Sequence, residues 1–135
     1  MLCYEQQYAL AIHSSFWGKK HKRWGLLGGR VEWREDPAAT VARELQEEID
    51  LSDLTPQPLQ PFNYKGSQHM VFGAHAPVKV TRYDRSELLD LKWFHYHEVQ
   101  AMAQNNLLHA GYELEAIRCF EALADETPAP VTKRS

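Results

Sequence analysis

Hydrophobic and polar positions are interspersed along the start of the chain in the way typical of strands. From Leu2 to His13 they include β-favouring Tyr and Ile, and Tyr8 to Ile12 is the clearest strand core. Trp24 to Leu27 follows as a short apolar stretch. It ends at Gly28-Gly29, where the chain can turn tightly and let a ligand approach the backbone. The pattern therefore predicts two strands that lead into a glycine turn.

The next apolar pattern has the period of a helix. Asp36 can accept backbone N–H groups as an N-cap and Pro37 suits the first helical position, so a helix is predicted over Pro37 to Ile49. Its apolar residues recur at helical spacing and form one stripe toward the core: Ala38, Val41, Ala42, Leu45 and Ile49. At about 100° per residue, three carboxylates fall on an adjacent face at the edge of the core: Glu44, Glu47 and Glu48.

Prolines and turn residues divide the middle of the chain. Asp53 to Pro61 carries three prolines and is predicted to be a linker within the domain. A hairpin is predicted beyond it, because two β-favouring segments, Leu59 to Tyr64 and His69 to Ala76, flank the turn-forming Lys65 to Gln68. Val78 to Thr81 is predicted to be a further extended piece.

The last third is predicted to hold one more strand and two helices. Asp84 to Leu91 is acidic and turn-like or briefly helical, and Lys92 to Tyr96 is a short aromatic strand. Helices are predicted over Glu98 to Asn105 and over Tyr112 to Leu123. From Asp125 onward the prolines and the charged end predict a disordered tail.

Length and composition limit the class of protein. A chain of 135 residues fits one domain, which we expect over residues 1–124 with residues 125–135 as its tail. The formal net charge of -3 argues against a protein that binds nucleic acid over a broad basic surface. No signal peptide or membrane span is evident, and Cys3 and Cys119 lie far apart, as suits free thiols in a reducing compartment. We therefore expect a cytoplasmic protein without membrane contact.

The three glutamates of the predicted helix lie within about one turn. Like charges at this spacing repel by a few tenths of a kcal/mol in an isolated helix. A solvated acidic face is one explanation of such a cluster. A divalent cation is the other, because Mg2+ takes oxygen ligands and is commonly shared between carboxylates and substrate phosphates.

The spacing of the neighbouring residues favours the cation. The pattern Gly-x5-Glu-x7-Arg-Glu-U-x-Glu-Glu-x-Gly-U, where U is a bulky aliphatic residue, matches at eight of nine specified positions: Gly29, Glu35, Arg43, Glu44, Leu45, Glu47, Glu48 and Leu51. Asp50 takes the place of the second glycine. With this motif, and with its strands, hairpin and acidic loop in the same order, the chain resembles the Nudix hydrolase family, specifically its small MutT-like members.

The resemblance implies both a fold and an activity. The fold is α/β of the α+β kind, an αβα sandwich with a mixed central β-sheet. The activity is hydrolysis of a phosphoanhydride bond in a nucleoside diphosphate linked to another group, X, with Mg2+ or Mn2+ holding the diphosphate. Short chains of this kind often resemble nucleotide-sanitising triphosphatases, so a (d)NTP, cleaved to the nucleoside monophosphate and pyrophosphate, is the first choice of substrate.

The family's site residues carry over by position in the motif. The implied metal ligands are the Gly29 carbonyl and three carboxylates: Glu44, Glu47 and Glu48. Glu35 matches the glutamate that supports metal-bound water, and Arg43 matches the arginine that orients the cluster.

The general base is left open. Glu44 or Glu48 could take the proton if the metal does not saturate it. Some members use a carboxylate of a later loop, for which Glu87 is the first candidate and Asp90 the second. The alternative for both later residues is an ordinary surface acid.

Candidate substrate contacts lie outside the helix. Trp24, Tyr64, Phe62 and Phe72 could stack on a base, although core packing is the alternative for each. Arg30, beside the glycine turn, is a further candidate for substrate binding.

Four histidines are further candidates, and two rival functions remain. His69 and His75 could reach a pocket from the hairpin, and His95 and His97 could share a zinc ion only with a further ligand. The main rival function is a catalytically inactive Nudix-fold module that senses a nucleotide or binds a protein, and a second rival is an acidic helix in an unrelated α/β domain. A homodimer is left open.

Overall fold

The computed structural model describes residues 1–15, 22–27, 36–52 and 54–126. Its elements, in chain order, are β1 (Leu2–Tyr4), β2 (Gln7–His13), β3 (Gly25–Leu26), α1 (Pro37–Ile49), β4 (Gln57–Pro58), β5 (Phe62–Tyr64), β6 (Ser67–His69), β7 (Phe72–His75), β8 (Leu88–His95), α2 (Tyr96–Gln104) and α3 (Glu113–Glu126).

Strand β2 organises the main sheet, which has six strands within the described residues. On one edge β2 pairs antiparallel with β8 along its whole length. On the other edge it pairs with β1 through Gln7 to Ala9 and then with β3 at Leu10 and Ala11. Strand β1 also pairs with β7 in parallel, and β7 pairs with β4. The sheet is therefore mixed, as predicted.

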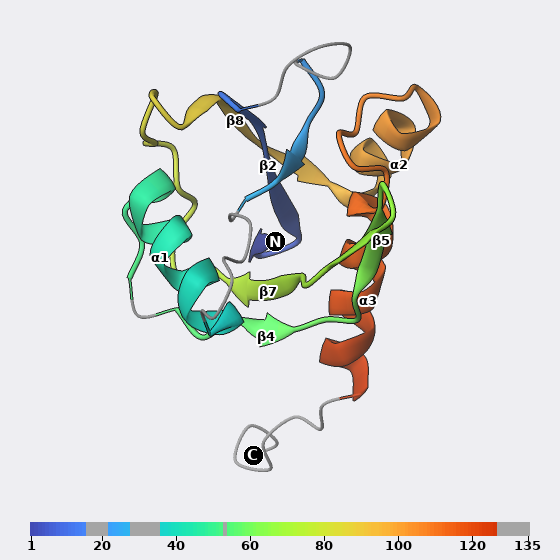
Figure 1. Ribbon diagram of the computed structural model, residues 1–135, viewed down its shortest axis with the longest axis horizontal. Coiled ribbons are helices and arrows are strands. Elements are labelled where there is room, and N and C mark those ends of the chain that lie inside the picture. The colour runs from blue at the N-terminus through green and yellow to red at the C-terminus, as the bar shows by residue number, and fades with distance from the viewer. Residues whose placement is uncertain (16–21, 28–35, 53, 127–135) are drawn as a thin grey trace.

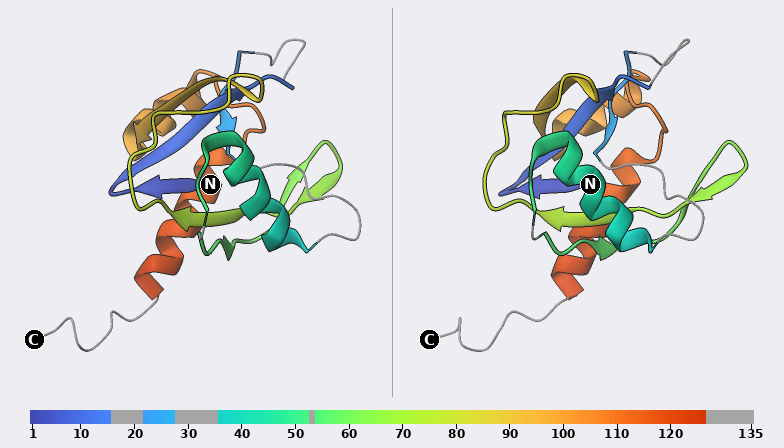
Figure 2. Two further views of the ribbon diagram at one scale, coloured as in Figure 1. Left: turned by 90° about the vertical axis from the view of Figure 1, so that its left-hand side faces the viewer. Right: turned by 60° about the vertical axis from the view of Figure 1, so that its left-hand side comes forward.

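Helices cover both faces of this sheet (Figures 1 and 2). Ala9 and Ala11 of β2 belong to the hydrophobic cluster that packs against Val41 and Leu45 of α1. The alternate positions of β2 point into a second cluster with α2 and α3. The predicted αβα sandwich of the α+β class is confirmed.

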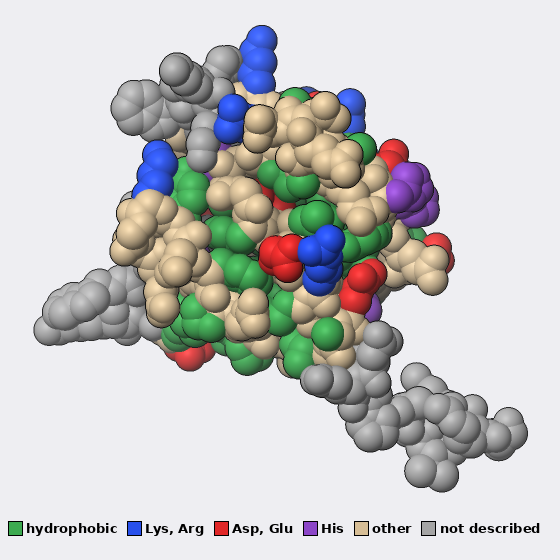
Figure 3. Space-filling view, turned by 90° about the vertical axis from the view of Figure 1, so that its right-hand side faces the viewer, with side chains coloured by type: hydrophobic (Ala, Val, Ile, Leu, Met, Phe, Trp, Pro, Cys, Tyr) green, Lys and Arg blue, Asp and Glu red, His purple; other side chains and the backbone are tan. Residues whose placement is uncertain are grey.

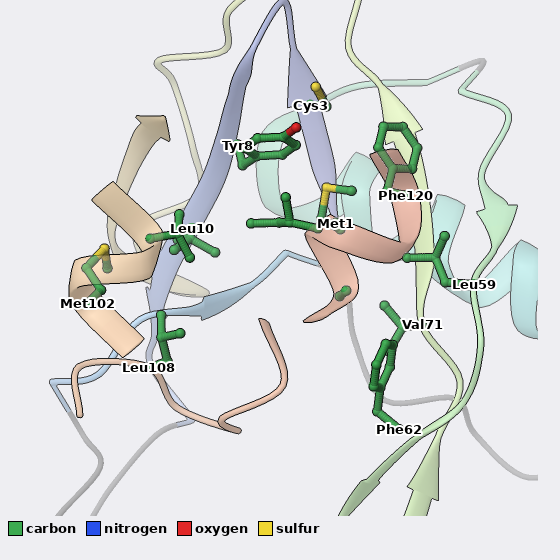
Figure 4. Close-up of a cluster of buried hydrophobic side chains, with 13 residues drawn as sticks. Met1, Cys3, Tyr8, Leu10, Leu59, Phe62, Val71, Met102, Leu108 and Phe120 are labelled. Carbon is green, nitrogen blue, oxygen red and sulfur yellow. The ribbon is translucent and has the colours of Figure 1, made fainter. Parts of the chain in front are cut away.

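The second cluster joins segments far apart in the chain (Figure 4). Tyr8 and Leu10 of β2 lie in it with Met102 of α2 and Phe120 of α3, and Phe62 reaches it from the hairpin. All five of these side chains are buried. The hairpin is thus tied to the core, which fixes its position beside the sheet.

Helix α1 has the bounds that the sequence predicted. The Ala39 N–H donates to the Asp36 side chain at 3.0 Å, and Pro37 occupies the start of the helix. At the other end Asp50 adopts the left-handed conformation, with φ 55 and ψ 39, and its N–H donates to the Gln46 carbonyl at 2.9 Å. This is a C-cap position that glycine usually fills.

We expect Asp50→Gly to raise the free energy of unfolding by about 1 kcal/mol or less, because glycine adopts positive φ without the steric penalty of a Cβ. The melting temperature, measured by circular dichroism or calorimetry, tests this. Asp50→Ala is the control and should lower it, since alanine tolerates the left-handed region poorly. A melting temperature of Asp50→Gly equal to or below that of the parent would contradict this account of the cap.

The hairpin is tighter than predicted. Only Lys65 and Gly66 form its turn, with φ 51 and φ 82, the two positive values that a two-residue hairpin turn requires. Ser67 and Gln68, which were predicted to belong to the turn, lie in β6, which pairs with β5. The predicted second segment holds the last residue of β6 and then β7, which joins the main sheet. The predicted linker Asp53 to Pro61 contains the short strand β4.

Later boundaries also shift. Val78 to Thr81 lies outside the strands, and the Trp93 indole N–H donates to the Val80 carbonyl at 2.6 Å. Strand β8 begins at Leu88, inside the segment predicted to be turn-like, because it pairs with all of β2. Helix α3 runs to Glu126, two residues into the predicted tail, and residues 127–135 lie outside the described part.

Three further features of the described residues concern membrane helices, cysteines and surface charge. None of the described helices is long and apolar enough to cross a membrane. Cys3 and Cys119 are both free thiols, and Cys3 is buried. The face on the right of Figure 1 carries hydrophobic, acidic and basic side chains interspersed, and its visible Lys and Arg side chains form no continuous basic surface (Figure 3).

Candidate active site

Helix α1 presents three of the four glutamates of the motif at different depths. The exposed fraction of the side chain is 3% for Glu48, 21% for Glu44 and 50% for Glu47. Arg43 lies between Glu44 and Glu47, the two more exposed glutamates. Its Nη2 lies 3.5 Å from Glu44 Oε1, and its Nε lies 3.7 Å from Glu47 Oε1. The guanidinium therefore offsets part of their repulsion, as an orienting arginine would.

A pocket of about 570 Å³ lies beside α1. Glu44 and Glu48 line it together with Glu87, whereas Glu47 and Asp90 are not among its lining residues. The structure thus places Glu87, the first candidate from the later loop, at the same pocket as Glu44 and Glu48. Asp90 instead lies opposite Ile12 in the β2–β8 ladder.

Backbone contacts hold the loop of Glu87 against α1 and β2. The Asp84 N–H donates to the Glu48 carbonyl at 2.8 Å, which satisfies one of the last carbonyls of the helix. The Ser14 N–H donates to the Glu87 carbonyl at 2.9 Å. The Glu87 side chain is exposed, so it is positioned by its backbone and can still move.

The charge on Glu44 is disfavoured in this setting. Burial, followed by the neighbouring charge of Glu47, raises the pKa of Glu44, while Arg43 opposes the rise. A raised pKa makes Glu44 a better proton acceptor near neutral pH than an ordinary glutamate.

The same effect predicts a pH-dependent change in stability for Glu44→Gln in metal-free protein. A folded-state pKa above the unfolded value means that folding is penalised once the pH exceeds both values and is not penalised below both. Glutamine removes this penalty, so at neutral pH the variant should have a higher melting temperature than the parent. The gain in the free energy of unfolding should be less than about 1 kcal/mol, since the group is partly solvated. Melting temperatures from acid to neutral pH test it: the difference should shrink as the pH falls through the pKa of Glu44. A difference that grows toward acid pH would contradict it.

His13, which the sequence did not single out, contacts Glu48, the most buried glutamate of α1. Its Nε2 lies 2.8 Å from the Leu26 carbonyl and its Nδ1 lies 3.5 Å from Glu48 Oε2. Burial lowers the pKa of His13, and the hydrogen bond to Leu26 opposes this. A signal existed in the sequence, since His13 shares the strand face of Ala9 and Ala11 and is the polar exception there.

Aromatic side chains line the other part of the pocket. Tyr64, His69, His109 and Tyr112 contribute rings, with the Tyr64 centroid 5.3 Å from that of His69 and 5.8 Å from that of His109. The His69 Nδ1 lies 3.0 Å from the Tyr112 hydroxyl. In Figure 1 the helix α1 and the hairpin, labelled at β5, lie on opposite sides of the chain start.

The segment before α3 is fixed by a buried carboxylate. Glu113 accepts the N–H groups of Ala110 and Gly111, both at 2.8 Å, and only 1% of the residue is exposed. Burial raises the pKa of the adjacent Tyr112 to about 12, so its hydroxyl keeps its proton at neutral pH. The turn that leads into Tyr112 is therefore held by these two hydrogen bonds.

Comparison with known proteins identifies the family. A family model described as the NUDIX domain matches residues 1–113. The chain belongs to the Nudix family. It is a MutT-like Nudix hydrolase, an enzyme that acts on diphosphate bonds. Nudix hydrolases are generally pyrophosphohydrolases of nucleoside diphosphates linked to another group, and they generally need a divalent cation such as Mg2+ or Mn2+.

Solved structures share the Nudix fold at low sequence identity. A Deinococcus radiodurans protein has a TM-score of 0.68 and 16% identity, covering 88% of this chain and 78% of its own. A mutT/nudix family protein from Listeria innocua has a TM-score of 0.66 and 18% identity, covering 89% and 82%. An Ap4A hydrolase from C. elegans has a TM-score of 0.59 and 20% identity, covering 90% and 93%. The comparison with curated proteins gives no match.

Three of the candidate site residues lie in a segment next to α1 that the structure does not describe. Gly29, Arg30 and Glu35 lie outside the described residues. Trp24 can be placed, and it packs edge-on against Phe94 at 5.2 Å, with Lys92 Nζ 5.8 Å from its ring centroid. It is not among the residues that line the pocket.

The remaining candidates divide between core and surface. Phe62 and Phe72 are buried in the two hydrophobic clusters, which is the core-packing alternative, and Phe72 also lines the pocket. His75 packs against Phe120 at 4.9 Å, away from the pocket. His95 and His97 stack at 5.7 Å, and no group of three His, Cys, Asp or Glu side chains in the described part of the chain could enclose a metal ion by itself.

Proposed function

We propose that this Nudix hydrolase is a divalent-metal-dependent pyrophosphohydrolase with a (d)NTP as its first-choice substrate, releasing the nucleoside monophosphate and pyrophosphate. One observation carries the proposal: a single pocket is lined by Glu44, Glu48 and Glu87 on one side and by aromatic rings on the other. A nucleotide has the matching halves, a polyphosphate that needs a cation and a base that can stack.

The donor set on the carboxylate side fits a hard cation. Glu44, Glu47 and Glu48, with the Gly29 carbonyl, would hold Mg2+ or Mn2+, which prefer oxygen ligands. Such sites commonly use few carboxylates and complete their shell with substrate phosphates and water. The cation would neutralise diphosphate charge and lower the pKa of bound water. Glu47 is assigned by its place in the motif.

The chain's own residues would then manage the proton and the orientation. Glu44, if the cation does not saturate it, is our first choice for the general base because of its place in the pocket, with Glu48 as the alternative and Glu87 as the acid of the later loop. Arg43 would hold Glu44 and Glu47 in place, as its two contacts already do. Glu35 would support the attacking water.

On the aromatic side, we assign the base contact to Tyr64. Its ring lines the pocket and is half-buried, whereas Trp24 packs against Phe94. Stacking of a base on an aromatic side chain contributes about 1–3 kcal/mol. Arg30 would contact the phosphates. We further propose that the substrate is a small cytoplasmic nucleotide derivative.

Phosphate release from a substrate panel tests the function. The panel holds NTPs, dNTPs, ADP-ribose, dinucleoside polyphosphates and capped RNA, each with Mg2+ or Mn2+, with inorganic tripolyphosphate as the base-free control. We expect turnover of nucleoside triphosphates, none without metal, and a KM for Tyr64→Leu raised by about tenfold with little change in kcat. No turnover on any substrate, with tight metal-independent nucleotide binding, would favour the inactive module. Equal turnover of tripolyphosphate would remove the role of the base.

A further inference from the structure

His13 lies where the elements of the site meet. It ends β2, and the β2–β8 ladder changes register there: Ile12 lies opposite Asp90, and His13 lies opposite Leu88. Leu89 is thus an extra residue on β8, as in a β-bulge, and bulges commonly redirect a neighbouring side chain. The imidazole extends between the end of β3 and the most buried glutamate of α1.

The contact with β3 determines which ring nitrogen carries hydrogen. The Leu26 carbonyl oxygen can only accept, so His13 Nε2 at 2.8 Å is the donor. The atom that faces Glu48 Oε2 is then Nδ1, at 3.5 Å. A histidine that binds a metal through one nitrogen usually donates its other N–H to a backbone carbonyl or carboxylate, which fixes its tautomer and orientation.

The separation of Nδ1 and Oε2 also suits a shared cation. With metal–ligand bonds of about 2.0–2.2 Å, two neighbouring ligand atoms lie roughly 3–3.5 Å apart. His13 is 8% exposed and Glu48 is 3% exposed, so neither can easily swing away into solvent. Both residues line the pocket beside Glu44.

We propose that His13 Nδ1 is a nitrogen ligand of the cation that Glu48 binds. This rests on the metal dependence in the proposed function, and it adds a ligand that the glutamate motif does not contain. An imidazole in place of an oxygen ligand favours later transition metals over Mg2+. The site should therefore bind Co2+ and Mn2+ with a larger advantage over Mg2+ than an all-oxygen site has.

Two substitutions separate the nitrogen ligand from the contact with Leu26. His13→Asn places an amide near the position of Nδ1 but cannot reach Leu26. His13→Gln can still donate to Leu26 but presents no imidazole. Circular dichroism and melting temperatures establish that each variant folds. If His13→Asn fails to fold, His13→Gln still tests the proposal, because it keeps the contact with β3. His97→Asn is the matched control, because His97 is exposed and does not line the pocket.

The decisive measurement is electron spin-echo spectroscopy of Mn2+ bound to the full chain with a non-hydrolysable nucleotide analogue. We expect hyperfine coupling to a directly bound nitrogen in the parent and in His97→Asn, and its loss in both His13 variants. In calorimetric titrations, His13→Asn should weaken Co2+ binding by about tenfold or more and Mg2+ binding by about threefold or less.

Three outcomes would count against the proposal, and they can be told apart. Bound Mn2+ without nitrogen coupling in the parent would overturn the assignment of His13. So would equal losses of Co2+ and Mg2+ affinity in His13→Asn, which would indicate that His13 only orients Glu48. Absence of saturable binding of any of these cations by the parent would refute the metal dependence of the proposed function as well.

Discussion

Glu48→Gln is expected to lower kcat by about a thousandfold while leaving the fold intact. A catalytic metal contributes several kcal/mol to stabilising the transition state, and about 4 kcal/mol corresponds to this factor. Glu48 is the most buried glutamate of α1, and its carboxylate contacts His13 in the pocket. Glutamine keeps the size of the side chain, and the contact from Asp84 is made to the Glu48 backbone, so the helix end should be undisturbed.

Steady-state kinetics at saturating Mg2+ or Mn2+, with melting temperatures alongside, measure this effect. Glu115→Gln is the matched control: the same substitution on an exposed helical position, where the ion pair with Arg118 contributes little. Glu47→Gln tests the motif itself, and we expect it to abolish activity although Glu47 is half exposed. Undiminished turnover of Glu48→Gln would remove that residue from the metal site.

Helix α1 could be predicted closely because its signals are local. The cap at Asp36, the proline after it and the apolar period all act within a few residues, and the structure keeps the predicted bounds. Asp50 behaves the same way, since the left-handed conformation belongs to the residue that leaves the helix. Local chemistry was sufficient wherever the structure depends on neighbours in sequence.

The strands were predicted less well because their bounds depend on distant partners. Leu88 begins β8 only because β2 extends to His13, and Pro58 lies in a strand only because Phe72 lies opposite it. A polar, acidic sequence before Leu88 gives no sign of this pairing. The hairpin turn was narrower than predicted because Lys65 accepts positive φ beside Gly66.

The site shows the same division. The spacing of Glu44 and Glu48 on one helix was enough to predict that both share a site, and the resemblance to the family suggested Glu87 of a later loop; all three line the pocket. His13 was missed because its relation to Glu48 is created by the packing of β2 against α1. On the aromatic part, Tyr64, Phe72 and His69 were candidates from the sequence, whereas His109 and Tyr112 were missed. Tyr112 reaches the hairpin from the far end of the chain.

Gly73→Ala should clearly destabilise the fold outside the active site. A Cβ at Gly73 in β7 would lie 2.3 Å from Phe120 Cδ1 and 2.8 Å from Cε1, both far below contact distance. The ring is buried and packs against His75, so it cannot move without disturbing α3 or the sheet. Overpacking of this kind costs about 1–3 kcal/mol, which corresponds to a melting temperature lower by roughly 3–10 °C.

A double-mutant cycle identifies the clash as the cause. Phe120→Leu alone should destabilise the protein by removing part of a buried ring, but it also shortens the side chain that meets position 73. Gly73→Ala should therefore cost clearly less in the Phe120→Leu background than in the parent, with a coupling energy above about 0.5 kcal/mol. Urea unfolding of the four proteins measures this. An equal loss of unfolding free energy in both backgrounds would show that the clash with Phe120 is not the reason for a glycine at position 73.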